Sequence, residues 1–247
     1  MTIEFINISE QEFIAKYPYM YRYMSFENIM DMFQKNKIRM ASPSTWKDPY
    51  EKYFYESSYQ FPNNACKNID NHNNLFACCF TYSGSCEASW KMYRPNSAVL
   101  QAKFHTQTLI DALRKTTGPT IYIGIVNYST TKNIVKEAKQ SISNFNGSST
   151  GKLSAKEWLN ILLHKRSAFS YEKEIRLFTF ADDNVTVDNK NCFLPLNNAN
   201  NACSDITISP ELSSVLADTI KYTLNSFGIK AKHSYLYKGL NSKTIVL

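Results

Sequence analysis

The chain has 247 residues and a formal net charge of +7, and 43% of its residues are hydrophobic, enough to build a packed core in one large domain or two small ones. Only seven residues are Gly, which excludes a glycine-looped nucleotide binder, whereas 16 Tyr and 15 Phe make the chain rich in aromatic rings. The positive charge favours an acidic partner such as nucleic acid, but the basic residues are scattered, and a solvated basic surface explains them equally well.

No membrane span is expected, because no apolar run approaches the roughly 20 residues that a spanning helix needs. The first five residues lack the basic and apolar regions of a signal peptide, so we expect a cytoplasmic protein with reduced thiols. The six cysteines form no C-x-x-C pair and the four histidines are scattered, so no metal site is expected.

The first fifty residues predict two strands and one helix. Residues 1–18 are a lead-in of mixed polarity, and 19–24 predict a strand. A serine that suits an N-cap then precedes apolar residues at helical spacing, which predict a helix from 26 to about 35. A second strand over 38–41 leads into 42–51, whose hydroxyls and prolines predict a rigid loop.

The middle of the chain alternates strands and helices after a polar loop over residues 55–74. Three strands are expected, the last of them central because of its regular isoleucines: 75–81, 98–104 and 120–128. Three helices are expected between and after them: 86–93, 106–115 and 130–143. The polar, glycine-containing residues 144–153 then predict a mobile loop.

The last third begins with a capping box of Ser154 and Glu157, which predicts a helix to about residue 167. After the strand described below, the expected elements are a short strand over 192–196, a strand over 205–208, a helix from Ser209-Pro210 to Gly228 and a strand over 229–236. The fold class we expect is α+β. Residues 1–247 would form a single mixed domain with a central, mostly antiparallel sheet flanked by helices.

Residues 170–178 predict a strand that carries charge where a buried strand is usually apolar. By alternation, Glu172, Glu174 and Arg176 share one side, which places the two carboxylates roughly 7 Å apart at their Cα atoms. One carboxylate can then hold a substrate hydroxyl while the other polarises a second reactant, provided that Arg176 or a ligand neutralises them. The alternative is an exposed edge strand with a solvated ion pair.

Three further groups allow two interpretations each. Arg22, set among aromatic residues, either contacts a phosphate or pairs with an acidic side chain such as Asp48, Glu51 or Glu174. Asp48 and Glu51 are either part of a site or a structural clasp for their loop. The aromatic pair at 90 and 93, three residues apart on a helix, is either a ligand platform or part of the core.

Six stretches together resemble a bacterial family known as domain of unknown function 2971. They are, in chain order, Tyr21–Asn28, Ser42–Glu51, Cys79–Thr81, Trp90–Tyr93, Tyr171–Arg176 and Ile208–Tyr237. Each motif alone is weak, but the ordered set covers nearly the whole chain. The sequence departs from the family pattern in having Trp46-Lys47 in place of Phe-Asn, and Met24 in place of Arg.

The order of these elements is similar to the ADP-ribosyltransferase fold, including its DNA-modifying toxin branch. This resemblance implies that Glu174 engages the nicotinamide ribose and that Glu172 prepares the acceptor, with Arg176 as the third catalytic candidate. Cleavage of the nicotinamide–ribose bond passes through an oxocarbenium-like state, which a nearby carboxylate stabilises.

The same resemblance implies residues that bind NAD and residues that flank the site. A guanidinium suits a pyrophosphate, hydroxyls suit the ribose or the nicotinamide amide, and rings suit stacking. The residues expected to bind NAD are Arg22, Tyr23, Ser42, Ser44, Trp90 and Tyr93. The further site candidates are Trp46, Asp48, Glu51 and Tyr171.

The expected function is an NAD-dependent ADP-ribosyltransferase-like effector or toxin, with NAD as co-substrate, nucleic acid or protein as acceptor, and phage defence as one setting. The charge and the aromatic content favour nucleic acid, since unpaired bases stack on rings. An inhibitor or partner protein is a further expected partner. Two alternatives stay open: a nuclease that uses Glu172, Glu174, Asp48 and Arg22, with or without Mg²⁺, and a non-catalytic module that binds nucleic acid or protein.

Overall fold

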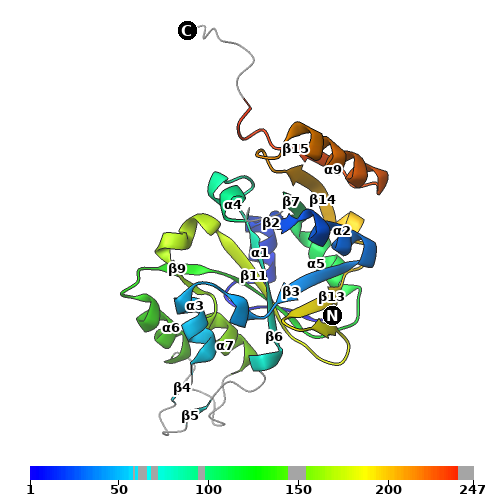
Figure 1. Cartoon of the computed structure of the whole chain (residues 1–247). Coiled ribbons are helices and arrows are strands. Elements are labelled where there is room, and N and C mark those ends of the chain that lie inside the picture. The colour runs from blue at the N-terminus through cyan, green and yellow to red at the C-terminus, as the bar shows by residue number, and fades with distance from the viewer. Residues whose placement is uncertain (58, 61–65, 68–71, 94–97, 144–153, 239–247) are drawn as a thin grey trace, which may run out of the picture.

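One mixed sheet of eleven strands runs through the described part of the chain (Figure 1). The computed structural model describes residues 1–57, 59–60, 66–67, 72–93, 98–143 and 154–238. Eight strands form a continuous path in the order β1 (Ile3–Phe5), β8 (Ile121–Ile125), β11 (Glu174–Phe180), β6 (Leu75–Thr81), β2 (Tyr19–Ser25), β7 (Val99–His105), β14 (Cys203–Ile208) and β15 (Ala231–His233). Three more form one branch that starts at β6, in the order β3 (Lys37–Ala41), β13 (Asn191–Pro195) and β12 (Thr186–Asp188).

The sheet divides at β6. On one side β6 pairs with β11 over its whole length, in a register that places Thr81 opposite Glu174. On the other side it pairs with β2 only where Thr81 meets Tyr21, and with β3 only where Ala77 meets Ala41. β2 therefore meets β6 at the residue opposite Glu174 and diverges from it beyond that pair.

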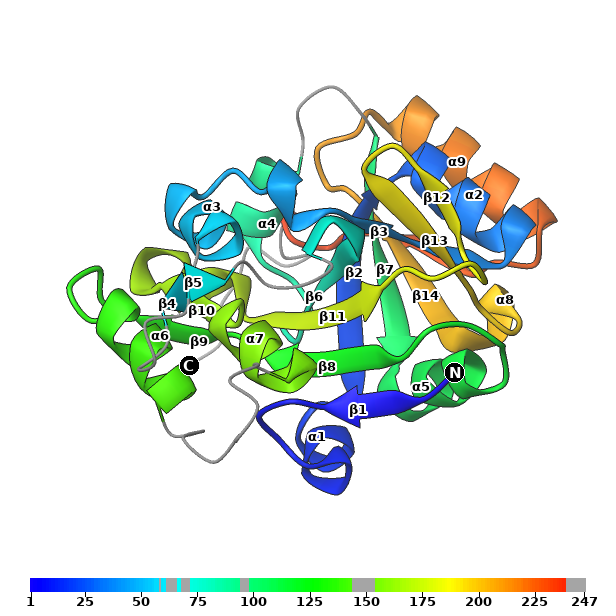
Figure 2. The ribbon, with the colours of Figure 1, turned by 90° about the horizontal axis from the view of Figure 1, so that it is seen from below.

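Helices cover both faces of the sheet, because alternate residues of β6 and β11 point into two separate apolar cores. The first core receives Phe80 and Leu177 and is covered by α2 (Phe26–Lys35), α5 (Thr106–Arg114) and α9 (Ser214–Ser226). The second receives Ala77 and Phe178 and is covered by α3 (Pro49–Glu56), α6 (Ile134–Ser143) and α7 (Ala155–Ile161). Figure 2 shows β1, β8 and β11 side by side between these helices, with α1 (Glu10–Lys16) beside β1.

The expected α+β class is confirmed, with a sheet that is mostly antiparallel and flanked by helices. Among the strands of the continuous path, only β1–β8 and β14–β15 pair in parallel. The predictions of β2, α2, β3, β6, β7 and α5 agree with the structure to within about two residues. None of the described helices combines the length and the apolar character that crossing a membrane requires. A single domain over the whole chain stays a prediction, and the expected loop at 144–153 lies outside the described residues.

Several predictions of single elements are wrong. The featureless lead-in contains β1 and α1, and the loop expected over 42–51 ends in α3, which Asp48 caps by accepting from the Tyr50 N–H at 2.9 Å. The helix expected to reach residue 167 ends at Ile161, and a short strand, β10 (His164–Arg166), follows. The helix α9 begins after an N-cap at Ser213, four residues later than predicted. Ser209 instead accepts from the Glu211 N–H, in a turn that precedes the helix.

The charged strand predicted over 170–178 is correct only in its second half. Residues Ser167–Glu172 form a 3₁₀ helix, η3, and Lys173 adopts a left-handed conformation with φ of 47° before β11 begins at Glu174. β11 lies between β8 and β6, so the alternative of an exposed edge strand is wrong as well.

Candidate active site

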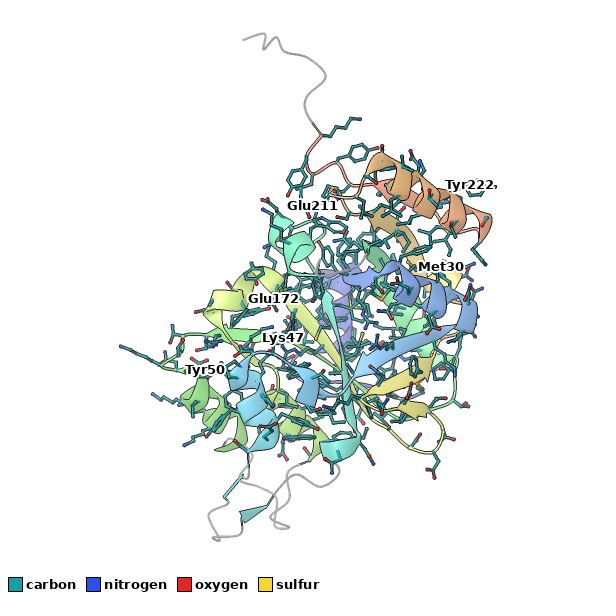
Figure 3. The ribbon with its side chains drawn as sticks, viewed as in Figure 1. Met30, Lys47, Tyr50, Glu172, Glu211 and Tyr222 are labelled. Atoms are coloured by element: carbon teal, nitrogen blue, oxygen red, sulfur yellow. The ribbon has the colours of Figure 1, made fainter. Side chains whose placement is uncertain are left out.

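A narrow cleft opens where β2 diverges from β6. Its lining comes from β2, from β6, from α4 (Glu87–Met92) with the residue after it, and from the end of η3 with the start of β11. The side chains that matter chemically are Tyr21, Arg22, Tyr23, Tyr93, Glu172 and Glu174. The free volume is about 20 Å³, room for a single water molecule. In Figure 3 the label of Glu172 marks the position of the cleft, which lies far from Tyr222 on α9.

The two glutamates reach the cleft from different elements. Glu174 is the first residue of β11, and its N–H donates to the Tyr128 hydroxyl at 2.9 Å. Glu172 ends η3, and the left-handed turn at Lys173 connects the two. Both side chains are buried, with 8% of Glu172 and 6% of Glu174 exposed. The sequence prediction that these carboxylates lie close together is therefore correct in its result, although only Glu174 is on the strand.

Lys165 of β10 connects three carboxylates. Its Nζ lies 2.5 Å from Oε2 of Glu172, 3.5 Å from Oε2 of Glu174 and 3.6 Å from Oε2 of Glu51. The lysine is 6% exposed, so these contacts are little screened by water. A single ammonium group thus holds together side chains from α3, η3 and β11.

Arg176 completes the network and is only 1% exposed. Its Nε and Nη2 donate to Oε2 of Glu174 at 3.0 and 2.6 Å, and Nη2 also donates to Glu51. Nη1 donates to the Leu162 carbonyl at 2.6 Å, and the guanidinium lies 4.4 Å from the centre of the Trp46 ring. Because each of its three nitrogens donates within the protein and the residue does not line the cleft, Arg176 holds Glu174 in place rather than contacting a substrate.

The network gives its two cleft glutamates different charge states. Three carboxylates face two cations, which leaves one negative charge if every group is ionised. Burial raises the pKa of Glu172 to about 7, and the negative charge of Glu174 adds to the effect. Burial also opposes ionisation of Glu174, but Arg176 and Lys165 outweigh it and lower the pKa of that carboxyl. Near neutral pH, Glu174 is ionised and Glu172 exchanges a proton readily.

Arg22 and the tyrosines form the other wall. The Arg22 guanidinium donates to the Arg39 carbonyl at 2.8 Å and lies 5.8 Å from the centre of the Phe80 ring. It forms no ion pair with the described acidic residues considered above, so that interpretation of Arg22 is wrong. Tyr23 and Tyr93 stack with their planes at 3° and their centres 5.5 Å apart. The wall thus combines a cation with two parallel rings.

Eight predicted site residues do not line the cleft: Arg176, described above, Glu51 and Tyr171, described below, and five more. Ser42 and Ser44 line a separate cavity of about 390 Å³. Trp90 is buried and packs edge-on against Tyr23. Asp48 pairs with Arg166 at 2.9 Å, and Trp46 contacts Arg176 as described. The clasp interpretation of the loop is thereby supported by its geometry.

Two other candidates lie at the edge of the site. Tyr171 is 38% exposed and donates to the Met92 sulfur at 3.7 Å, beside the cleft rather than in it. Glu51 lies beneath the cleft, where it binds Lys165 and Arg176.

The sequence interpretation missed Lys165, Tyr21 and Tyr128. The signal for Lys165 was the run of basic residues His164–Arg166, which interrupts the apolar periodicity of the preceding helix. No local pattern marks Tyr128, because its role depends on β9 (Asn127–Ser129) pairing with β10.

The described residues contain no group of three or more side chains suited to hold a metal ion. The carboxylates that come closest together are already bridged by an ammonium and a guanidinium group. The expectation of no metal stays a prediction.

The fold and the site define an α+β protein with a buried pair of glutamates in a cleft of its sheet. No protein-family model matches the chain, and no curated protein matches it. The likeness to domain of unknown function 2971 therefore stays a prediction.

Among solved structures, the chain is similar to DarT from Thermus sp. 2.9. In complex with ADP-ribosylated single-stranded DNA, that protein shares 8% identity with a TM-score of 0.40, over 89% of this chain and 95% of DarT. For the complex with NAD+, the identity is 9% and the TM-score 0.38, over 89% of this chain and 96% of DarT. For the complex with carba-NAD+, the identity is 10% and the TM-score 0.36, over 87% of this chain and 95% of DarT. A likeness this distant leaves the chemistry of the site to be judged from its own residues.

Proposed function

We propose that the chain is an ADP-ribosyltransferase-like enzyme that uses NAD as co-substrate and transfers its ADP-ribose to nucleic acid or protein. The observation that carries the proposal is the buried glutamate pair at the cleft, in which one carboxylate is held ionised and its neighbour exchanges a proton near neutral pH. A reaction that develops positive charge on a sugar while an acceptor loses a proton needs both of these groups.

In this reaction the bond between ribose C1′ and the nicotinamide nitrogen breaks, and its electron pair leaves with neutral nicotinamide. The ionised Glu174 stabilises the positive charge that develops on the ribose. The acceptor atom forms the new bond to C1′, and its proton passes to Glu172. Arg176 holds Glu174 directly and Glu51 holds Arg176; both are positioning residues, because neither lines the cleft.

The side chains that line the cleft fit NAD chemically, whereas the free volume of the cleft is too small for it. The Arg22 guanidinium suits a pyrophosphate, and the stacked rings of Tyr23 and Tyr93 suit the flat nicotinamide. With about 20 Å³ free, a dinucleotide enters only if side chains at the end of α4 and just after it move outward. Met92 and Tyr93 are the ones to move, since they are 38% and 42% exposed at the edge of the cleft.

The acceptor is the least constrained part of the proposal. The net charge of +7 favours nucleic acid over an acidic protein only modestly. The DarT structures contain ADP-ribosylated single-stranded DNA in one case and NAD+ in another, which makes both suitable probes. Action as a toxin, control by an inhibitor protein and a setting in phage defence extend the proposal and need tests in cells.

The test incubates purified protein with NAD labelled in its adenylate half and, separately, single-stranded DNA, RNA or cell lysate protein. Glu174→Gln removes the charge of the key carboxylate and should reduce nicotinamide release and label transfer by about 10³-fold. Glu56→Gln is the matched control, because Glu56 is an exposed glutamate of α3 that pairs only with Lys52 among the described residues.

Transfer of label to one acceptor class, lost in Glu174→Gln and retained in Glu56→Gln, supports the proposal and identifies the acceptor. Cleavage of nucleic acid without NAD consumption would support a nuclease instead. Binding without either reaction, unchanged in Glu174→Gln, would support a binding module.

A further inference from the structure

Lys165, which contacts both cleft glutamates without lining the cleft, is the charged group that the proposed reaction leaves unexplained. It lies on β10, a three-residue strand whose own sheet contains only β9 and β10. Its neighbour on the strand, Arg166, pairs instead with Asp48. The ammonium group reaches between η3 and β11, where it is nearly excluded from solvent.

The two cations of the network do not duplicate each other. Arg176 binds Glu51 and Glu174 but forms no ion pair with Glu172. Among the described residues, Lys165 is the one cation that pairs with Glu172, at 2.5 Å. The same Nζ lies 3.5 Å from Glu174. Lys165 therefore fixes the separation of the two cleft carboxylates, which Arg176 alone does not.

The groups around Glu172 come from several packed elements. From β10 and β11 they are Lys165 and Glu174, and from η3 it is Tyr171. From β9 and from the end of α4 they are the phenols of Tyr128 and Tyr93, both with pKa values raised by burial, so both stay neutral. Lys165 is thus the charge nearest to Glu172 that favours its ionised form.

We propose that Lys165 is a positioning residue, which holds Glu172 beside Glu174 and keeps Glu172 ready to accept the proton of the acceptor. This inference rests on the proposed function for its catalytic part, whereas its electrostatic part concerns the protein alone. With Lys165 in place, Glu172 loses its own proton near neutral pH. Without Lys165, two adjacent carboxylates share one proton over a wider range of pH, and Glu172 cannot accept another.

The experiment compares Lys165→Met, which removes the charge and keeps the length, with Lys165→Arg, which keeps the charge. Carboxyl groups are followed by ¹³C NMR in glutamate-labelled protein, and the Glu172 signal is assigned by its loss in Glu172→Gln. Lys165→Met should raise the titration midpoint of Glu172 by about one pH unit or more, and Lys165→Arg should restore much of the difference. Lys52→Met is the control, because Lys52 is an exposed lysine that pairs with Glu56.

A second readout is the pH profile of nicotinamide release. The limb that rises with pH should move upward in Lys165→Met by the same amount as the NMR midpoint, so that the loss of rate at neutral pH is partly recovered in more alkaline buffer. A purely structural role would lower the rate at every pH and leave the profile in place.

An unmoved Glu172 midpoint, or an equal shift in Lys52→Met, would overturn the inference. If the wild-type protein does not use NAD at all, the proposed function fails, and the NMR midpoints still decide whether Lys165 controls Glu172. Should Lys165→Met not fold, Lys165→Gln takes its place with the same expected direction.

Discussion

The two sides of the division at β6 differ in the charged side chains that they bury beside their apolar cores. On the side of β2, β7 and β14, the residues facing the first core are apolar and fully enclosed, such as Met20, Leu100 and Ile206. On the side of β11, the structure encloses three carboxylates, a lysine and an arginine. Apolar burial stabilises by about 25 cal/mol per Å². Buried ion pairs gain little, since desolvation offsets their attraction. The charged side is thus better explained by chemistry than by stability.

The largest expected effect is a loss of folding stability that depends on pH on the charged side of β6 and not on the apolar side. Arg176→Met leaves Glu51 and Glu174 without their guanidinium and should lower the free energy of unfolding by about 3–5 kcal/mol near neutral pH. Burial would then raise the pKa of the Glu174 carboxyl without Arg176 to oppose it, so the loss should be smaller at about pH 5 than at about pH 8. Denaturant unfolding at both pH values measures the difference.

The matched change on the apolar side is Leu100→Ala. It removes a fully buried side chain and should cost about 2–5 kcal/mol, equally at both pH values. If the two variants showed the same dependence on pH, the contrast between the two sides would be lost.

The next effect concerns Glu172 alone. Its pKa in the folded protein is raised to about 7. A carboxyl whose pKa is higher in the folded than in the unfolded state stabilises below its unfolded pKa and loses that contribution as the pH rises through the folded value. The wild type should therefore lose on the order of 2 kcal/mol from this group between about pH 4.5 and pH 7.5.

Glu172→Gln removes this titration. Its free energy of unfolding should improve relative to the wild type as the pH rises over the same window, as measured by unfolding at several pH values. A variant that fell below the wild type equally at every pH would show that Glu172 does not titrate in this range.

The smallest expected effect is on binding. Arg22→Gln removes the guanidinium from the cleft wall and should raise the KM for NAD by about tenfold or more, with a smaller change in kcat, if the guanidinium holds the pyrophosphate. Arg39→Gln is the control, because the Arg39 side chain donates to Asn28 and Asn191 outside the cleft. Equal KM values for both variants would remove Arg22 from the proposed NAD site.

The same contrast explains what the sequence can predict. The apolar side has local signals: alternation in β2 and β7, and helical spacing with a serine cap in α2, where the Asn28 N–H donates to Ser25 at 3.3 Å. These patterns reflect burial of neighbouring residues in one core, so short windows of sequence are enough.

The charged side lacks such signals, because its structure depends on contacts between distant residues. Glu51 and Arg176 are 125 positions apart, and Asp48 and Arg166 are 118 apart. The pair Glu172 and Glu174 was visible as a motif. By contrast, the position of Lys165 beside the two glutamates depends on β10, and the 3₁₀ helix follows that strand directly. β10 has only three residues, too few to show a periodic pattern. Ser42 and Ser44 were assigned to the site from a motif, and the fold places them in another cavity.

The most direct test of the central claim is a carboxyl titration of the wild-type protein by ¹³C NMR, with Glu172 and Glu174 assigned by their Gln variants. Two adjacent glutamates in different charge states should give one signal with a midpoint at about pH 7 and a second with a midpoint below the ordinary value of 4.5. If both carboxyls instead titrated together between about pH 4 and pH 5, as exposed glutamates do, the cleft would lack the division of charge on which the proposed reaction depends.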